Sequence, residues 1–127
     1  MSTQSRIGYL ENGVVTSISC HSDGYISFNG VLLQEYYKDI GKIKELIQRG
    51  NVAHLGTNVS NTSFYKDEDE TAIVESLSEY TSGASYHYLF DEKTGQWQVY
   101  NNEKVALLSN AINNFSSFMR IEGNHFK

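Results

Sequence analysis

Residues 6–20 read R-I-G-Y-L-E-N-G-V-V-T-S-I-S-C, two runs rich in apolar and β-branched residues on either side of Asn12-Gly13. Asn and Gly tolerate the positive φ angles that a tight hairpin turn requires. The stretch therefore predicts a β-hairpin. A turn at Asn12-Gly13 places Arg6 opposite roughly Ser19 to His21, at the open end of the two strands.

A second hairpin is predicted later in the chain. A-S-Y-H-Y-L-F-D (residues 84–91) and Q-W-Q-V-Y (residues 96–100) flank the turn sequence E-K-T-G, and both are rich in the aromatic residues that suit a pleated surface. Strand alternation puts Trp97 and Val99 on one face and Gln96, Gln98 and Tyr100 on the other.

Helical spacing marks the chain between the hairpins. Leu33, Tyr36, Tyr37 and Ile40 recur at intervals of three and four, which is typical of a helix. A second helix is expected from Asp39 as N-cap to Gly50, with Ile40, Ile43 and Ile47 facing inward. The polar residues 51–61 predict a loop, residues 63–66 a short strand and residues 71–80 a helix with Ile73, Leu77 and Tyr80 on one side.

From Glu103 onward the pattern predicts one further helix, in which Val105, Leu108, Ile112, Phe115 and Met119 form a stripe. This stripe covers the sheet or forms a seam between the helices of a homo-oligomer. The 127 residues suffice for a single domain, 1–127. The predicted fold class is α+β, with an antiparallel sheet of four or five strands built from the two hairpins and three or four helices packed mainly on one side.

Composition limits the partners. There are 10 Lys and Arg against 15 Asp and Glu, and no three basic residues cluster, which disfavours long nucleic acids. The single Cys20 cannot form an internal disulfide, and the polar start S-T-Q-S-R is unlike a signal segment, so a reducing cytoplasm is expected. No apolar run approaches the roughly 20 residues that cross a bilayer, so no membrane contact is expected.

The segment C-H-S-D-G-Y (Cys20–Tyr25) carries most of the reactive side chains. Cys20 and His21 are neighbours on an extended strand and point to opposite faces, which argues against a thiol nucleophile with its base and for a buried thiol. No C-x-x-C or H-x-x-x-H spacing occurs, so neither a metal nor another cofactor is predicted. Asp23-Gly24 is also an ordinary turn signature, and His21 with Asp23 remains as a candidate acid–base pair.

Register suggests a ligand site at this end of the sheet. The Arg6 guanidinium should lie near the loop, Gly24 exposes backbone N–H groups, and Tyr25 offers a stacking surface. These are the groups that a small phosphorylated nucleotide would need. The predicted ligand-binding residues are Arg6, His21, Asp23, Gly24, Tyr25 and Asn29, with no catalytic residue among them.

Several motifs resemble those of a family of small proteins found mostly in bacteriophages and prophages: S-T-Q-S-R-I-G-Y-L-E-N-G, S-I-S-C-H-S-D-G-Y, L-L-Q-E-Y-Y-K-D, K-I-K-E-L-I-Q-R-G-N, Y-L-F-D and W-Q-V-Y. Members often carry Trp where this chain has Ser22, so a stacking surface is missing here. The resemblance implies a phage-encoded accessory protein, a class that often counters host defence and includes sponges for nucleotide immune signals.

The leading hypothesis is therefore a non-enzymatic phage protein that sequesters a cyclic nucleotide or an ADP-ribose derivative in the cytoplasm of the infected bacterium. A second hypothesis is a protein–protein inhibitor whose acidic surface, including residues 67–70, docks on a basic site of a host defence protein. A third is a hydrolase that degrades the same signal with His21 and Asp23.

Overall fold

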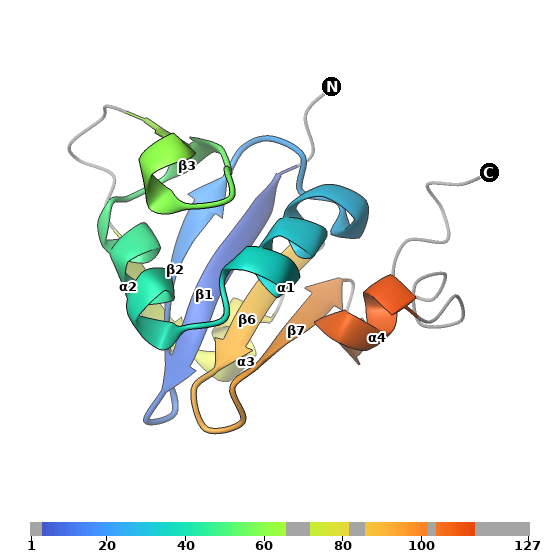
Figure 1. Ribbon diagram of the computed structural model, residues 1–127. Coiled ribbons are helices and arrows are strands. Elements are labelled where there is room, and N and C mark those ends of the chain that lie inside the picture. Colours follow the sequence, from blue (N-terminus) through green and yellow to red (C-terminus); the bar gives the residue numbers. More distant parts are fainter. Residues whose placement is uncertain (1–3, 66–71, 82–85, 102–103, 114–127) are drawn as a thin grey trace.

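The computed structural model describes residues 4–65, 72–81, 86–101 and 104–113, which form one sheet with helices on both faces (Figure 1). The strands are β1 (Ser5–Glu11), β2 (Val14–Cys20), β3 (Val52–His54), β4 (Ser63–Phe64), β5 (Ile73–Ser76), β6 (Tyr86–Asp91), β7 (Gln96–Asn101) and β8 (Lys104–Leu107). The helices are α1 (Val31–Tyr36), α2 (Ile40–Gln48), α3 (Leu77–Tyr80) and α4 (Leu108–Asn113), with a π-helical turn η1 (Ile26–Gly30) and a 3-10 turn η2 (Val59–Asn61).

The first hairpin forms as predicted. Asn12 and Gly13 have φ angles of 55° and 79°, the left-handed conformation that the tight turn requires. Strands β1 and β2 pair antiparallel with Arg6 opposite Ser19. The second hairpin, β6 with β7, also forms, and its alternation buries Trp97 and Val99.

The predicted sheet of four or five antiparallel strands is wrong. The sheet is mixed and eight-stranded, with the order β4-β3-β2-β1-β6-β7-β8 and with β5 paired to β2. The two hairpins meet through β1 and β6, which run parallel, with Ser5 opposite Tyr86. Turn signals determine each hairpin locally, but parallel pairing depends on a long crossover between them, which the periodicity of single segments does not reveal.

Two further strands arise where helix or loop was predicted. Residues 73–76 form β5 on the edge of β2, and only residues 77–80 are helical. Within the predicted loop 51–61, residues 52–54 form β3 beside Cys20. In both cases the edge of β2 offers unpaired backbone groups, and pairing with them outweighs local spacing.

The helix predicted from Glu103 onward is wrong in its first turn, since Lys104–Leu107 form β8 on the edge of β7 and α4 starts at Leu108. Phe115 and Met119, the far end of the predicted stripe, lie outside the described residues, and so does the acidic run at residues 67–70. Asp39 caps α2 as predicted, and its carboxylate accepts the Lys42 backbone N–H at 3.3 Å. Tyr36 does not face the core and is 49% exposed.

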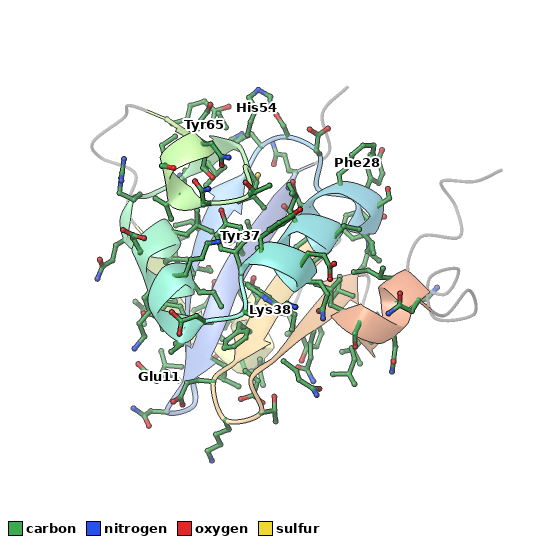
Figure 2. The ribbon with its side chains drawn as sticks, viewed as in Figure 1. Glu11, Phe28, Tyr37, Lys38, His54 and Tyr65 are labelled. Carbon is green, nitrogen blue, oxygen red and sulfur yellow. The ribbon has the colours of Figure 1, made fainter. Side chains whose placement is uncertain are left out.

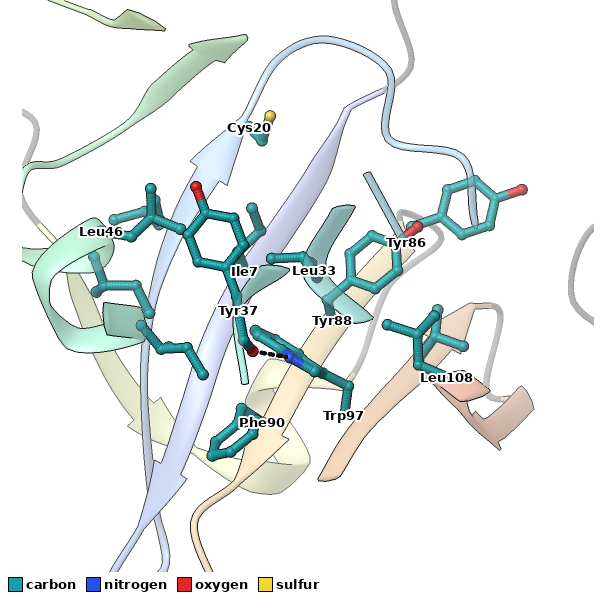
Figure 3. Packing of buried hydrophobic residues seen from close by; sticks show 14 of the residues in the cluster. Ile7, Cys20, Leu33, Tyr37, Leu46, Tyr86, Tyr88, Phe90, Trp97 and Leu108 are labelled. Carbon is teal, nitrogen blue, oxygen red and sulfur yellow. Dashed lines mark hydrogen bonds between the residues drawn. The ribbon is translucent and has the colours of Figure 1, made fainter. Parts of the chain in front are cut away.

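The main core lies between the sheet and helices α1, α2 and α4 (Figure 3). We call this side of the sheet the α1 face. Its aromatic residues are tied to backbone: the Trp97 indole N–H donates to the Tyr37 carbonyl at 2.8 Å, and the Tyr37 hydroxyl donates to the Gly56 carbonyl at 2.9 Å. These two hydrogen bonds fix the positions of the Trp97 and Tyr37 rings in the core.

The opposite side, the α3 face, has a smaller core of Val15, Tyr80 and Leu89. Helix α3 lies behind the sheet in Figure 1, and the Tyr80 hydroxyl donates to the Tyr88 carbonyl at 2.6 Å. Among the described residues, no helix combines the length and the apolar character needed to cross a membrane.

Strand β1 requires a glycine at position 8, on the α3 face, because the paired strand β2 lies very close to it. A Cβ atom at this position would lie 2.9 Å from the Ser17 Cβ atom and 3.0 Å from the Thr16 carbonyl oxygen. We expect Gly8→Ala to lower the free energy of unfolding by about 1–3 kcal/mol, because backbone on the paired strand must shift. Urea denaturation measures the loss, and the exposed Glu92→Ala serves as control. An unfolding free energy equal to that of the control would show that position 8 has room for a Cβ atom.

Candidate functional site

The loop from Cys20 to Gly30 carries all the predicted site residues except Arg6, and it is anchored at its start. The backbone N–H of His21 donates to the Val52 carbonyl at 3.0 Å, which extends β2 toward β3. Asp23 then takes a φ angle of 57°, a left-handed conformation that Asp tolerates better than most residues. The chain reverses there, and the Asn29 backbone N–H closes the loop by donating to the Asp23 carbonyl at 3.1 Å.

The loop continues into the π-helical turn η1. The Gly30 N–H donates to the Tyr25 carbonyl at 3.3 Å, a bond across five residues that widens the turn relative to an α-helix. Such turns are rare and frequently occur at functional sites. The wide turn brings the Phe28 side chain to the outside, where it is 54% exposed (Figure 2).

Asn29 holds the loop from inside. Its side chain is buried, and its amide Nδ2 donates to the Ser22 carbonyl at 2.9 Å and to the Cys20 sulfur at 3.3 Å. The Gly24 carbonyl is fixed in the same way by the Tyr88 hydroxyl at 2.6 Å. The Asn29 amide and the Gly24 carbonyl therefore hold the loop in place, and both groups are already engaged in hydrogen bonds within the protein.

Cys20 is buried as predicted, and its thiol donates to the Ser22 carbonyl at 3.5 Å. Burial raises the pKa of the Cys20 thiol, with the nearby Asp23 carboxylate adding to the rise against hydrogen bonds that lower it. A thiol in this state is a poor nucleophile at neutral pH.

A pocket of about 290 Å³ opens beside the loop; we call it the loop pocket. Its lining residues come from the loop, from the start of α1 and from the segment after β3: Asp23, Ser27, Phe28, Asn29, Val31, Leu32 and Leu55. Two predicted residues, Asp23 and Asn29, are thus brought together there. Asp23 contributes an exposed carboxylate, and no Lys, Arg or His is among the lining residues.

The other predicted residues lie outside this lining. Arg6 is on the α3 face, where its Nη1 and Nη2 donate to the hydroxyls of Ser19 and Ser17 at 2.7 and 2.6 Å. Its Nε is buried and has no hydrogen-bond partner among the described residues. Because Arg6 pairs with Ser19, one position before Cys20, it points away from the α1 face to which the Cys20 side chain belongs.

His21 and Tyr25 take part in aromatic packing. The His21 ring lies edge-on to Tyr65, with centroids 4.7 Å apart. Tyr25 packs against Tyr86 at 6.0 Å and against Phe28 at 6.4 Å between centroids. Tyr25 therefore supports Phe28 from the side without lining the pocket itself.

Sequence reasoning missed Phe28 and Leu55. An aromatic residue between polar neighbours in the Gly-containing segment S-F-N-G is a signal that could have identified Phe28. Leu55 lies far along the chain, and only the pairing of β3 with β2 brings it near the loop.

Within the described ranges, no three His, Cys, Asp or Glu side chains lie close enough together to hold a metal ion. Comparison of the chain with models of protein families, with curated proteins and with solved structures finds no match. The functional interpretation of the site therefore rests on the geometry of the site alone.

Proposed function

We propose that this protein binds a small nucleotide-derived molecule in the loop pocket and holds it unchanged. The observation that carries the proposal is an exposed aromatic ring, Phe28, beside the carboxylate of Asp23 in a pocket whose loop is locked from inside by Asn29. An apolar concave site with few polar groups is the usual form of a small-molecule site.

A ligand would use these groups as follows. A base stacks on Phe28 and contacts the apolar side chains of Leu32 and Leu55. The Asp23 carboxylate accepts hydrogen bonds from ribose hydroxyls or from an amino group of the base. Phosphate groups point out of the pocket, because the carboxylate repels them and the lining has no cation.

Two observations favour binding over catalysis. The Cys20 thiol is buried with a raised pKa, and the His21 ring packs on Tyr65 and is not among the residues that line the pocket with Asp23. The biological role that we propose is to sequester a cyclic nucleotide or an ADP-ribose derivative that signals in bacterial immunity, a role that suits the phage accessory protein implied by the resemblance.

The function is tested by titration calorimetry with ADP-ribose, a cyclic ADP-ribose and a cyclic dinucleotide. The expected result is a dissociation constant of about 1 µM or below for at least one of them. The bound ligand should be recovered intact after heat denaturation, whereas a hydrolase would return products. No binding of any of the three at micromolar concentrations would overturn the proposal.

Phe28→Ala is expected to weaken ligand binding by about 10-fold or more, because stacking of a base on an aromatic ring contributes about 1–3 kcal/mol. Calorimetry with the ligand that binds the wild type measures the change. Tyr36→Ala is the matched control, since Tyr36 is similarly exposed at 49% and does not line the loop pocket. Equal affinities of the two variants would show that the ligand binds elsewhere.

A further inference from the structure

A second pocket lies near the C-terminal end of α1, between that end of the helix, the β6–β7 hairpin and α4. It has a volume of about 250 Å³. Its lining residues are Gln34, Lys38, Phe90, Gly95, Gln96, Trp97 and Ser109. It shares no residue with the lining of the loop pocket.

The floor of this pocket is rigid. Phe90 and Trp97 are both only 3% exposed and meet edge to face with centroids 5.3 Å apart. The Trp97 indole N–H is already used by the Tyr37 carbonyl. The floor therefore provides an apolar surface with little capacity for hydrogen bonding. The side chains of the walls must supply the polar contacts that recognise a ligand.

The walls carry polar side chains that have no partner in the part of the chain that the structure describes. The side chains of Gln34, Lys38, Gln96 and Ser109 form no hydrogen bond or ion pair with any residue in the described part of the chain. They come from different elements but line the same pocket, so one molecule in the pocket can contact all of them. Figure 2 labels Lys38 between α1 and the strands β6 and β7.

Lys38 differs in this respect from the other lysines of the same region. Lys42 donates to the carbonyls of Tyr36 at 2.6 Å and Thr57 at 3.0 Å, and Lys44 pairs with Glu11 at 2.8 Å. The ammonium groups of Lys42 and Lys44 are thus used by the fold. The ammonium group of Lys38 is exposed at the pocket and has no carboxylate partner among the described residues.

We propose that this pocket, the Lys38 pocket, binds a small molecule that carries a phosphate or carboxylate group together with hydroxyl groups. Lys38 meets the anionic group, and the two glutamine amides and the Ser109 hydroxyl bind the remaining oxygens. At about 30 Å³ per water molecule, 250 Å³ equals roughly eight waters, which fits one molecule of the size of a sugar phosphate or a tricarboxylate.

The test is an NMR titration of the isotope-labelled full chain with glucose 6-phosphate, citrate and glucose at constant ionic strength. We expect saturable shifts of the Gln34 and Gln96 side-chain amides with a dissociation constant of about 1 mM or below for glucose 6-phosphate, citrate or both. Glucose 6-phosphate alone would identify phosphate as the preferred group and citrate alone would identify carboxylate. Shifts that are equal with glucose, or absent with all three, would overturn the proposal.

Lys38→Gln should weaken this binding by about 10-fold, and added NaCl should weaken binding to the wild type, because an exposed ammonium group is screened by salt. Lys104→Gln, which removes an exposed charge outside the pocket, is the matched control. Equal affinities of the two lysine variants would overturn the assignment. Phe28→Ala should leave binding in the Lys38 pocket unchanged. The proposal for the Lys38 pocket and the proposal for the loop pocket can therefore be overturned independently of each other.

Discussion

Replacing Trp97 by alanine is expected to lower the free energy of unfolding by about 3–5 kcal/mol. The indole is buried against Phe90 in the core of the α1 face, and its N–H satisfies the Tyr37 carbonyl where α1 ends. The variant leaves a cavity under α1 and also removes the hydrogen bond that ties that carbonyl to β7. Urea denaturation followed by circular dichroism measures the loss.

Two companion variants separate these contributions. Trp97→Phe keeps most of the buried volume and removes the indole N–H, so it should cost less than Trp97→Ala, on the order of 1–3 kcal/mol. Tyr36→Ala removes an exposed aromatic ring from α1 and should cost about 0.5 kcal/mol or less. A loss for Trp97→Ala no larger than that for Tyr36→Ala would contradict the role of the indole as the central contact of this core.

Asn29→Asp is expected to destabilise the protein strongly and in a pH-dependent way. The substitution keeps the size of the side chain but replaces the amide donor, which now bonds the Ser22 carbonyl and the Cys20 sulfur, by a carboxyl group. At neutral pH the buried carboxylate would face the Ser22 carbonyl oxygen, and we expect a loss of about 3 kcal/mol or more.

The sign of the pH dependence follows from burial. Burial raises the pKa of the new carboxyl group in the folded state above its unfolded value of about 3.9. Below about pH 4 the group is protonated in both states and the cost is small; the cost grows as the pH rises toward the folded pKa. Urea denaturation at pH 4 and pH 7 measures the difference.

The matched control is Asn58→Asp. Asn58 caps η2 from an exposed position, where its side-chain oxygen accepts the Asn61 N–H at 3.1 Å, and a carboxylate can accept the same bond. This variant should be nearly neutral at both pH values. A stability loss for Asn29→Asp that is independent of pH, or equal to that of the control, would show that Asn29 does not hold the loop.

Helix α1 lies between the two proposed sites. Val31 and Leu32 at its start line the loop pocket, and Gln34 in the helix and Lys38 just after it line the Lys38 pocket. A substitution that displaces α1, such as Trp97→Ala, should therefore affect both sites. Phe28 and Lys38 are each exposed and each line one pocket only, which makes them the informative positions for binding.

Local chemistry was sufficient for some elements. The Asn12-Gly13 turn, the alternation around Trp97, the Asp39 cap and the burial of Cys20 each depend on a few neighbouring residues, and each is present as predicted. The candidate site was predicted in part, since the loop itself and its residues Asp23 and Asn29 could be identified. The register that brings Arg6 opposite Ser19 was also correct.

The features of the fold that the sequence did not predict depend on contacts between distant segments. Spacings of three and four in residues 73–80 and 105–112 favour a helix, but the edges of β2 and β7 supply hydrogen-bond partners that turn residues 73–76 and 104–107 into strands. Likewise, no local signal states that β1 runs parallel to β6. Such pairings compensate the entropy of closing long loops only when the whole sheet forms.

The sequence by itself determined the two hairpins, the α1–α2 region and the loop that carries Asp23, because turn chemistry and short-range periodicity act within a few residues. Only the tertiary structure decided that the sheet is mixed, that Arg6 lies on the α3 face, and that Phe28 and Leu55 share a pocket. The physical reason is that a side chain's face and neighbours follow from strand pairing across the whole sheet, and this pairing is a property of the assembled fold.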